Sequence, residues 1–210
     1  MPAALDAAVR SPRGRPRSFD REQALDSAMR VFWAKGFAGA SMSDLTAAMG
    51  IASPSLYAAF GSKEGLFQEA VARYEATYSR LARDILAGPG RVRDQIEQVM
   101  RITVRTPSEQ EPAGCLVVAA CAQASDLSPE LAATLCEKRT NAARMMEARI
   151  VRAVEEGELP AGVNARAVAD FYATVQRGLV VGAKSGASVE ELGAVVTTAM
   201  AAWDALTSGG

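Results

Sequence analysis

Short polar side chains are concentrated between residues 41 and 64, in a stretch otherwise rich in Ala, Leu, Met and Gly. Serine hydroxyls and the free amides of a helix N-terminus bind phosphate oxygens, as do phenol and ammonium groups. Hydroxyls also reach base edges, and alanine methyls pack against thymine methyls. The side chains of these types are Ser41, Ser43, Ser53, Ser55, Tyr57, Ala58, Ala59 and Lys63. Their chemistry is that of nucleic-acid contact.

A run of arginines precedes this stretch. The twelve residues that end at Arg21 contain five arginines and one acid, a local surplus of four positive charges in a chain of net charge -1. Residues 1–17 carry Pro, Gly and Arg without periodicity, which predicts a flexible basic arm. A solvated tail, or an arm for membrane or RNA, is the alternative, but its position before the first helix favours DNA. Arg15 and Arg17 are then candidate minor-groove probes.

Three short helices are predicted to position these side chains. Capping residues and apolar periodicity indicate helices over residues 20–35, 41–49 and 53–60, each followed by glycine. We expect Ser53 to be the N-cap of the third helix and Pro54 its first residue. Two short helices joined by a three-residue turn predict a helix-turn-helix, which lays its second helix in the major groove.

The rest of the chain is also predicted to be helical. No alternating strand pattern competes with the helical periodicity, so the fold class is all-α, with about nine helices in total. A long helix over 62–87 is expected to connect two domains. The later helices are expected at 92–106, 113–125, 128–156, 164–184 and 188–203.

The composition argues against several classes of protein. The chain has 210 residues, no histidine and three cysteines. Without histidine it lacks the usual general base and the commonest metal ligand, so we expect no enzyme activity, no metal site and no cofactor. Charges interrupt every apolar run, which predicts no membrane span, and the N-terminus lacks a signal peptide's apolar region. These features predict a cytoplasmic protein with reduced thiols.

Several linked motifs resemble those of the TetR family of bacterial regulators. The match covers roughly residues 14–70, and this spacing of several motifs is specific. The motifs are Gly14-Arg-Pro-Arg17, Ala34-Lys-Gly-Phe37, Ser41-Met-Ser-Asp-Leu45, Met49-Gly-Ile51 and Ser55-Leu-Tyr-Ala-Ala-Phe-Gly-Ser-Lys-Glu64. The remainder resembles the family only in the number and length of its helices.

The resemblance implies a repressor that binds a palindromic operator in double-stranded DNA as a homodimer and is released by a small-molecule ligand. It implies three parts: a flexible basic arm at 1–17, an N-terminal three-helix DNA-binding domain with a helix-turn-helix at 18–64, and a larger helical ligand-binding and dimerisation domain at 65–210. The family often has a basic residue after the turn and an imidazole or phenol late in the third helix. This chain has Pro54, Ala58 and Ala59 there, so the operator sequence does not carry over.

The DNA contacts are expected to divide by chemistry. Ser41, Ser43, Tyr57 and Lys63 are suited to phosphates, which fix register rather than sequence. Ser53, Ser55 and Ala59 are suited to base edges. Because few of these side chains can make paired contacts to a base, we expect phosphates and the arginine arm to supply a larger share of affinity.

An apolar pocket for an inducer of unknown identity is predicted between the later helices. Arg149 or Gln176 would supply a polar anchor, and for each lining residue core packing is the alternative. The candidate lining residues are Met100, Thr103, Val104, Leu116, Met145, Met146, Phe171, Tyr172 and Val175.

Two further hypotheses concern the same domain. The last two helices are rich in Ala, Gly and Val, which favours a four-helix dimer interface, with burial inside one subunit as the alternative. Cys115 is expected at a helix N-terminus, where a thiolate forms more easily. A redox- or electrophile-sensing regulator acting through Cys115 is therefore the alternative to ligand release, and a buried structural cysteine is the alternative to both.

Overall fold

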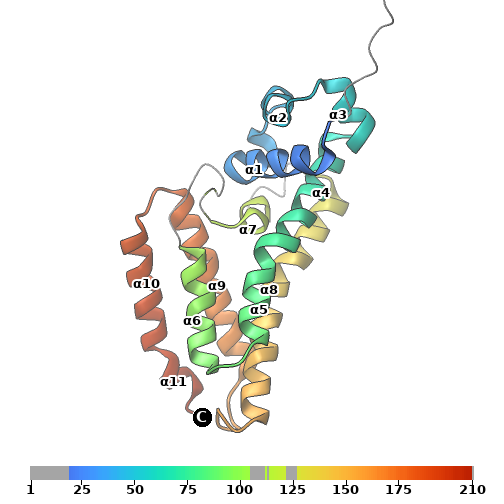
Figure 1. Ribbon diagram of the computed structural model, residues 1–210. Coiled ribbons are helices and arrows are strands. Elements are labelled where there is room, and N and C mark those ends of the chain that lie inside the picture. Colours follow the sequence, from blue (N-terminus) through green and yellow to red (C-terminus); the bar gives the residue numbers. More distant parts are fainter. Residues whose placement is uncertain (1–18, 105–111, 113, 122–126, 210) are drawn as a thin grey trace, which may run out of the picture.

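The computed structural model describes residues 19–104, 112, 114–121 and 127–209, and every regular element in these ranges is a helix (Figure 1). Helices α1 (Arg21–Gly39), α2 (Met42–Met49) and α3 (Ser53–Phe60) form a three-helix unit, called the head below. The other bounds are α4 Lys63–Tyr74, η1 Glu75–Ser79, α5 Arg80–Ala87, α6 Val92–Thr103, α7 Leu116–Cys121, α8 Pro129–Glu155, α9 Ala165–Lys184, α10 Val189–Ala201 and α11 Trp203–Thr207. The all-α prediction is confirmed.

The head is organised by its caps and by aromatic packing. The carboxylate of Asp20 accepts hydrogen bonds from the amides of Glu22 and Gln23 and starts α1. Gly36 has φ 73° and ψ 178°, so regular helix geometry stops at the predicted glycine, although α1 resumes as far as Gly39. The Phe32 ring packs edge-on against Phe67 of α4, with centroids 4.9 Å apart. This contact packs the head against α4, the helix that follows it in the sequence.

The start of α3 differs from the prediction. Ala52, not Ser53, is the N-cap, with extended backbone angles and a carbonyl that accepts from the amides of Ser55 and Leu56. Ser53 is therefore already helical, and its hydroxyl makes no capping bond. Pro54 is tolerated one position further in because the first amides of a helix have no intrahelical partner to lose.

The long connecting helix is not regular. Residues 63–87 form one rod (α4, η1 and α5), but Glu75–Ser79 are π-helical, and this segment is called the π turn below. A π turn inserts an extra residue into an α-helix, and such insertions are frequent at functional sites. Five residues are too few to disturb the apolar periodicity of the whole rod, which is why the sequence predicts an unbroken helix.

Two later helices also differ from the prediction. Gly114 has φ 79° and lies against Val180, so α7 begins at Leu116 rather than at 113. The predicted ends of the helices over 92–106 and 113–125 lie partly outside the described residues. The last predicted helix is divided at Ala202 into α10 and α11.

Two cores hold the molecule together. The core of the head extends beyond the head itself and includes Leu116, Leu131 and Leu135 from α7 and α8. The second core lies among α6, α8, α9 and α10, with Tyr172 and Trp203 at its centre. The head is thus packed on the helical domain as well as joined to it by the rod.

Polar contacts also connect the head to the helical domain. The Lys184 ammonium in α9 donates to the Trp33 carbonyl oxygen at 2.6 Å. The Glu64 carboxylate, in the first turn of α4 just after the head, accepts from the Ser128 amide at 2.9 Å. A displacement of the end of α9 therefore reaches the head directly, and a displacement of the start of α8 reaches it through α4.

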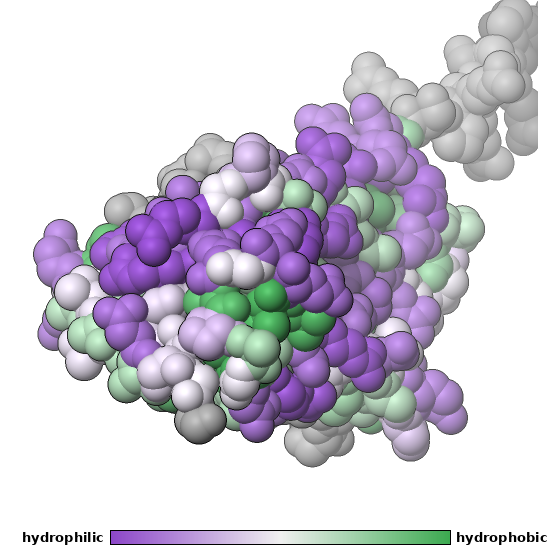
Figure 2. Space-filling model, turned by 90° about the horizontal axis from the view of Figure 1, so that it is seen from below, coloured by the Kyte–Doolittle hydropathy of each residue, from purple (hydrophilic) through white to green (hydrophobic). Residues whose placement is uncertain are grey.

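The opposite end of the molecule is mostly polar. Seen from below, the most strongly apolar residues form a patch near the centre of the view, and other apolar residues are scattered among polar ones (Figure 2). Within the described ranges, no helix has both the length and the hydropathy to cross a membrane.

Candidate nucleic-acid interface and ligand cavity

The helix-turn-helix of α2 and α3 lies at the end of the molecule farthest from the C-terminus (Figure 1). Gly50 turns the chain between α2 and α3 in the left-handed region, at φ 66° and ψ 27°. Leu45 and Leu56 are fully buried between the helices. Ser53, Ser55, Tyr57 and Ala58 lie on the exposed side of α3, and the side chain of Tyr57 is 49% exposed. The turn thus orients α3 with its short polar side chains outward.

The N-terminus of α2 is held by a capping box. The Ser41 hydroxyl accepts from the Asp44 amide at 3.0 Å and donates to the Asp44 carboxylate at 2.8 Å. The Lys35 ammonium lies 2.6 Å from the same carboxylate. The hydrogen bonds from Lys35 and Ser41 lower the pKa of Asp44 to about 2. The amides of Ser41, Asp44 and Leu45 are already hydrogen-bonded within the box. Ser43 is exposed beside it, so its hydroxyl is accessible to a phosphate.

Lys63 lies at the first position of α4, next to the end of α3. Its ammonium is 4.5 Å from the centre of the Phe37 ring, and partial burial lowers its pKa. A cation over an aromatic face is held by the ring's quadrupole. This contact orients Lys63 on the head and limits its side-chain freedom.

Ala59 and Arg21 have structural contacts that the sequence did not indicate. Ala59 is only partly exposed and packs against the core of the head. Its carbonyl accepts from Arg21, which also pairs with Glu69 at 2.7 Å and lies over the Phe60 ring. Arg21 therefore joins α1, α3 and α4. Arg15 and Arg17 lie outside the described residues.

A cavity of about 460 Å³ lies among the rod, α6, α7, α8 and α9. Of the predicted ligand residues, Thr103, Met145 and Met146 line it, together with Gln176. The Gln176 amide donates to the Thr103 hydroxyl at 3.1 Å. The cavity volume lies within the range of small-molecule sites.

The other predicted ligand residues do not line this cavity. Met100 and Leu116 are fully buried in the two cores, and Val104 is buried in the second core. Val175 packs against the second core, and Phe171 is 37% exposed. Tyr172 is also buried; its hydroxyl donates to the Ala199 carbonyl, and burial raises its pKa to about 12. Periodicity places these residues on helix faces but does not show which face meets the cavity.

Arg149 is likewise not part of the cavity wall. Its guanidinium is 3% exposed and donates to Gln95, to the Gly90 carbonyl and to the Glu158 carboxylate. These contacts hold the turn between α5 and α6 against the end of α8. The expected anchor therefore has a structural role.

Several cavity residues were not expected from the sequence. Tyr74 and Tyr78 come from the rod, and their rings lie 4.9 Å and 4.8 Å from the ring of Trp33 in the head. Glu75 of the π turn and Lys138 of α8 form an ion pair in the wall. On a regular helix these charged side chains are typical of a solvated face, and no local signal distinguishes them.

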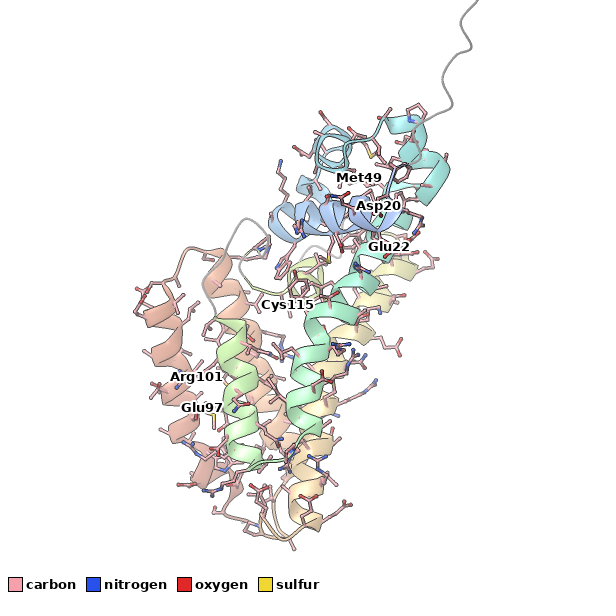
Figure 3. All side chains as sticks on the ribbon, viewed as in Figure 1. Asp20, Glu22, Met49, Glu97, Arg101 and Cys115 are labelled. Atoms are coloured by element: carbon pink, nitrogen blue, oxygen red, sulfur yellow. The ribbon has the colours of Figure 1, made fainter. Side chains whose placement is uncertain are left out.

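The three cysteines differ in their surroundings. Cys115 is partly buried, lines the cavity and lies just below α1 (Figure 3). Cys121 donates to the Leu135 carbonyl, and Cys136 is exposed. All three are free thiols. Of the three, Cys115 is the one placed to meet a molecule in the cavity.

A helix-turn-helix head packed on a helical domain with a cavity of ligand size defines the class of the protein. It is the arrangement of a transcription regulator, in which one part contacts DNA and another can hold a small molecule.

Comparison with known proteins identifies the family. Residues 24–70 match the family described as "Bacterial regulatory proteins, tetR family", and residues 88–199 match "Tetracyclin repressor-like, C-terminal domain". The chain therefore belongs to the TetR family of DNA-binding transcription regulators, which are not enzymes.

Two repressors of Escherichia coli (strain K12) are similar over most of the chain. The HTH-type transcriptional repressor ComR is 30% identical over 94% of this chain and 95% of its own length. The HTH-type transcriptional repressor BdcR is 34% identical over 90% of each chain. Among solved structures, a cysteine mutant of the TetR family transcriptional regulator CifR, in complex with a 26 bp double-strand operator DNA, is 46% identical with a TM-score of 0.82. That match covers 90% of this chain and all of CifR.

Proposed function

We propose that this regulator is a homodimeric cytoplasmic repressor that binds a palindromic operator through α3 and leaves it when a small molecule enters the cavity. The observation that carries the proposal is that Tyr74 and Tyr78 line the cavity and also contact Trp33 of the head. A ligand that displaces either ring acts on the head through a single layer of side chains. The operator complex of CifR supports the DNA-binding part.

The dimer is proposed to form through α9 and α10. These helices expose apolar side chains that a monomer would leave in water: Val181 is 57% exposed and Val195 is 47% exposed. Gly178 and Gly193 have open space beside them, which permits close approach of a partner helix. Two copies of the pair would form a four-helix bundle.

Such a dimer would place its two α3 helices in successive major grooves, about 34–36 Å apart. A ligand that favours a different spacing weakens DNA binding. A coupling free energy of roughly 1–3 kcal/mol changes the affinity by about 5- to 150-fold, which is enough for regulation.

The first test is selection of bound sequences from a random DNA duplex library by the full-length protein at physiological salt. Low salt would be uninformative because it promotes nonspecific phosphate binding. We expect enrichment of an inverted repeat, which would then serve as the DNA for release assays. Enrichment of a single half-site, or of no sequence, would contradict the dimeric operator proposal.

A second candidate mechanism is supported by the position of Cys115 in the cavity wall. Cys115 follows Gly114, which lies against Val180 and Lys184 of α9. The Lys184 ammonium in turn donates to the Trp33 carbonyl of the head. Modification of the thiol by an electrophile or oxidant would alter that contact. Release from DNA that is unchanged in Cys115→Ser would eliminate this mechanism and leave non-covalent ligand binding.

A further inference from the structure

The cavity wall separates charged from apolar side chains. Among the described residues that line it, one is an acid, Glu75, and three are bases, Arg83, Lys138 and Arg144, a surplus of two positive charges. Arg83 and Arg144 are exposed and come from α5 and α8, which marks the opening between these helices. The inner wall is apolar and buried, and includes Leu86, Val99, Val117, Met146 and Val180. The cavity therefore has a cationic entrance and an apolar interior.

The ion pair between Glu75 and Lys138 is intermediate in exposure between these two groups of residues. Both side chains are largely withdrawn from solvent, at 22% and 27% exposure. The two residues belong to different helices, so the pair joins the π turn to α8. Arg83 also contacts the π turn, because its guanidinium donates to the Glu75 carbonyl at 3.4 Å. Removing either member of such a pair leaves a poorly solvated charge that needs a new partner.

An anionic ligand can be that partner for Lys138, and Arg83, whose guanidinium already donates to the Glu75 carbonyl, is the nearby base for the displaced Glu75 carboxylate. We propose that the cavity binds a small organic carboxylate with an aromatic or aliphatic body, and that its carboxylate takes Lys138 from Glu75. The body of the ligand occupies the apolar interior, where its burial is favourable. A cationic ligand would face the surplus positive charge, and a neutral ligand would gain nothing from it. This inference rests on the proposed function, in which the same cavity holds the inducer.

The exchange reaches the head by a short path. Glu75 is the first residue of the π turn, and Tyr74 and Tyr78, which contact Trp33, lie on either side of it in sequence. Loss of the Lys138 contact frees the segment that sets the position of both rings. The charge of the ligand, and not only its volume, thus affects the conformation of the rod.

The test is calorimetric titration of the full-length protein without DNA. Matched probes differ only in the polar end: cinnamate, cinnamyl alcohol and cinnamylamine, and decanoate, decanol and decylamine. We expect at least one carboxylate to bind about ten-fold or more tightly than its alcohol, as a charge-assisted hydrogen bond supplies. The corresponding amine should bind more weakly than the alcohol.

Two variants of the ion pair should act in opposite directions. Lys138→Gln should remove most of the preference for the carboxylate, whereas Glu75→Gln should increase carboxylate affinity because the competing anion is gone. General loss of structure would lower affinity in both variants, so the opposite signs separate the mechanism from misfolding. Arg101→Gln and Glu97→Gln are matched controls: they break a similar ion pair on α6 (Figure 3) that does not line the cavity, and should leave affinity unchanged.

Equal affinity of both carboxylates and their alcohols, or a carboxylate preference that survives Lys138→Gln, would overturn the proposal. The outcome is distinguishable from failure of the proposed function. Carboxylate binding without release of the selected DNA contradicts ligand-controlled repression, whereas release by a neutral compound alone contradicts only the ligand class.

Discussion

Lys63 is predicted to contact a DNA phosphate, an interaction that would not depend on the base sequence. Its ammonium is oriented by the Phe37 ring, next to the end of α3. Because a phosphate contact releases one condensed counterion, Lys63→Gln should weaken binding to every sequence and reduce the slope of log affinity against log salt by about 1. Fluorescence anisotropy over a salt series, on the selected operator and on an unrelated duplex, measures both slopes.

Arg101→Gln, which removes a charge far from the head, is the control and should leave the slope unchanged. Ser55→Ala should instead alter the preference among operator sequences, since Ser55 is exposed on α3. A Lys63→Gln protein with the wild-type salt slope would show that Lys63 makes no phosphate contact.

The residue scale also shows a limit of sequence reasoning. The types of the α3 side chains indicate DNA contact, and their exposure agrees with that prediction for Ser53, Ser55 and Tyr57. Ala59 is different, because it lies three residues after the buried Leu56, on the same side of α3, and so packs partly against the core of the head. The N-cap of α3 also differs from the prediction by one residue, at Ala52. A shift of one residue at a helix start is below what capping preferences can resolve.

At the scale of the element, the capping box of α2 gives a direct test of stability. Ser41→Ala removes the side chain that caps the Asp44 amide, and we expect a loss of roughly 1 kcal/mol in the free energy of unfolding. Ser43→Ala is a matched control two residues away, because Ser43 is exposed and is not the cap. Urea denaturation of the two variants measures the difference. Equal losses would mean that the cap is not what stabilises α2.

Elements were predictable where their signals are local. Capping residues, glycine stops and apolar periodicity are properties of neighbouring positions, and they place α2, α8 and α9 within about a residue of their ends. The π turn and the cavity are not local. Glu75 and Lys138 lie 63 residues apart, and only the packing of the rod against α8 brings them together.

At the scale of the whole molecule, the shared core predicts cooperative unfolding. Leu135 of α8 packs in the core of the head, so the head should not unfold before the helical domain. The two tryptophans report on the two cores: Trp33 on the first and Trp203 on the second. Trp203→Phe and Trp33→Phe proteins should therefore show coincident denaturation midpoints by fluorescence.

Leu135→Ala extends this test. It should lower both midpoints, at a cost of about 2–5 kcal/mol for a buried leucine. Separate midpoints in the two single-tryptophan proteins, or a loss confined to the Trp33 signal, would show that the head is an independent folding unit.

The π turn has one more consequence, which concerns the phase of the helix. A π turn holds an extra residue compared with regular α-helix, and each residue of an α-helix corresponds to about 100° of rotation and 1.5 Å of rise. If the turn at Glu75–Ser79 reverted to α-helix, everything on its N-terminal side would follow a screw motion of that size relative to α5. The rod would then couple a local change from π-helix to α-helix to a rotation of the head. In the proposed complex, the angle at which α3 enters the major groove of DNA would depend on whether the extra residue of the π turn is present.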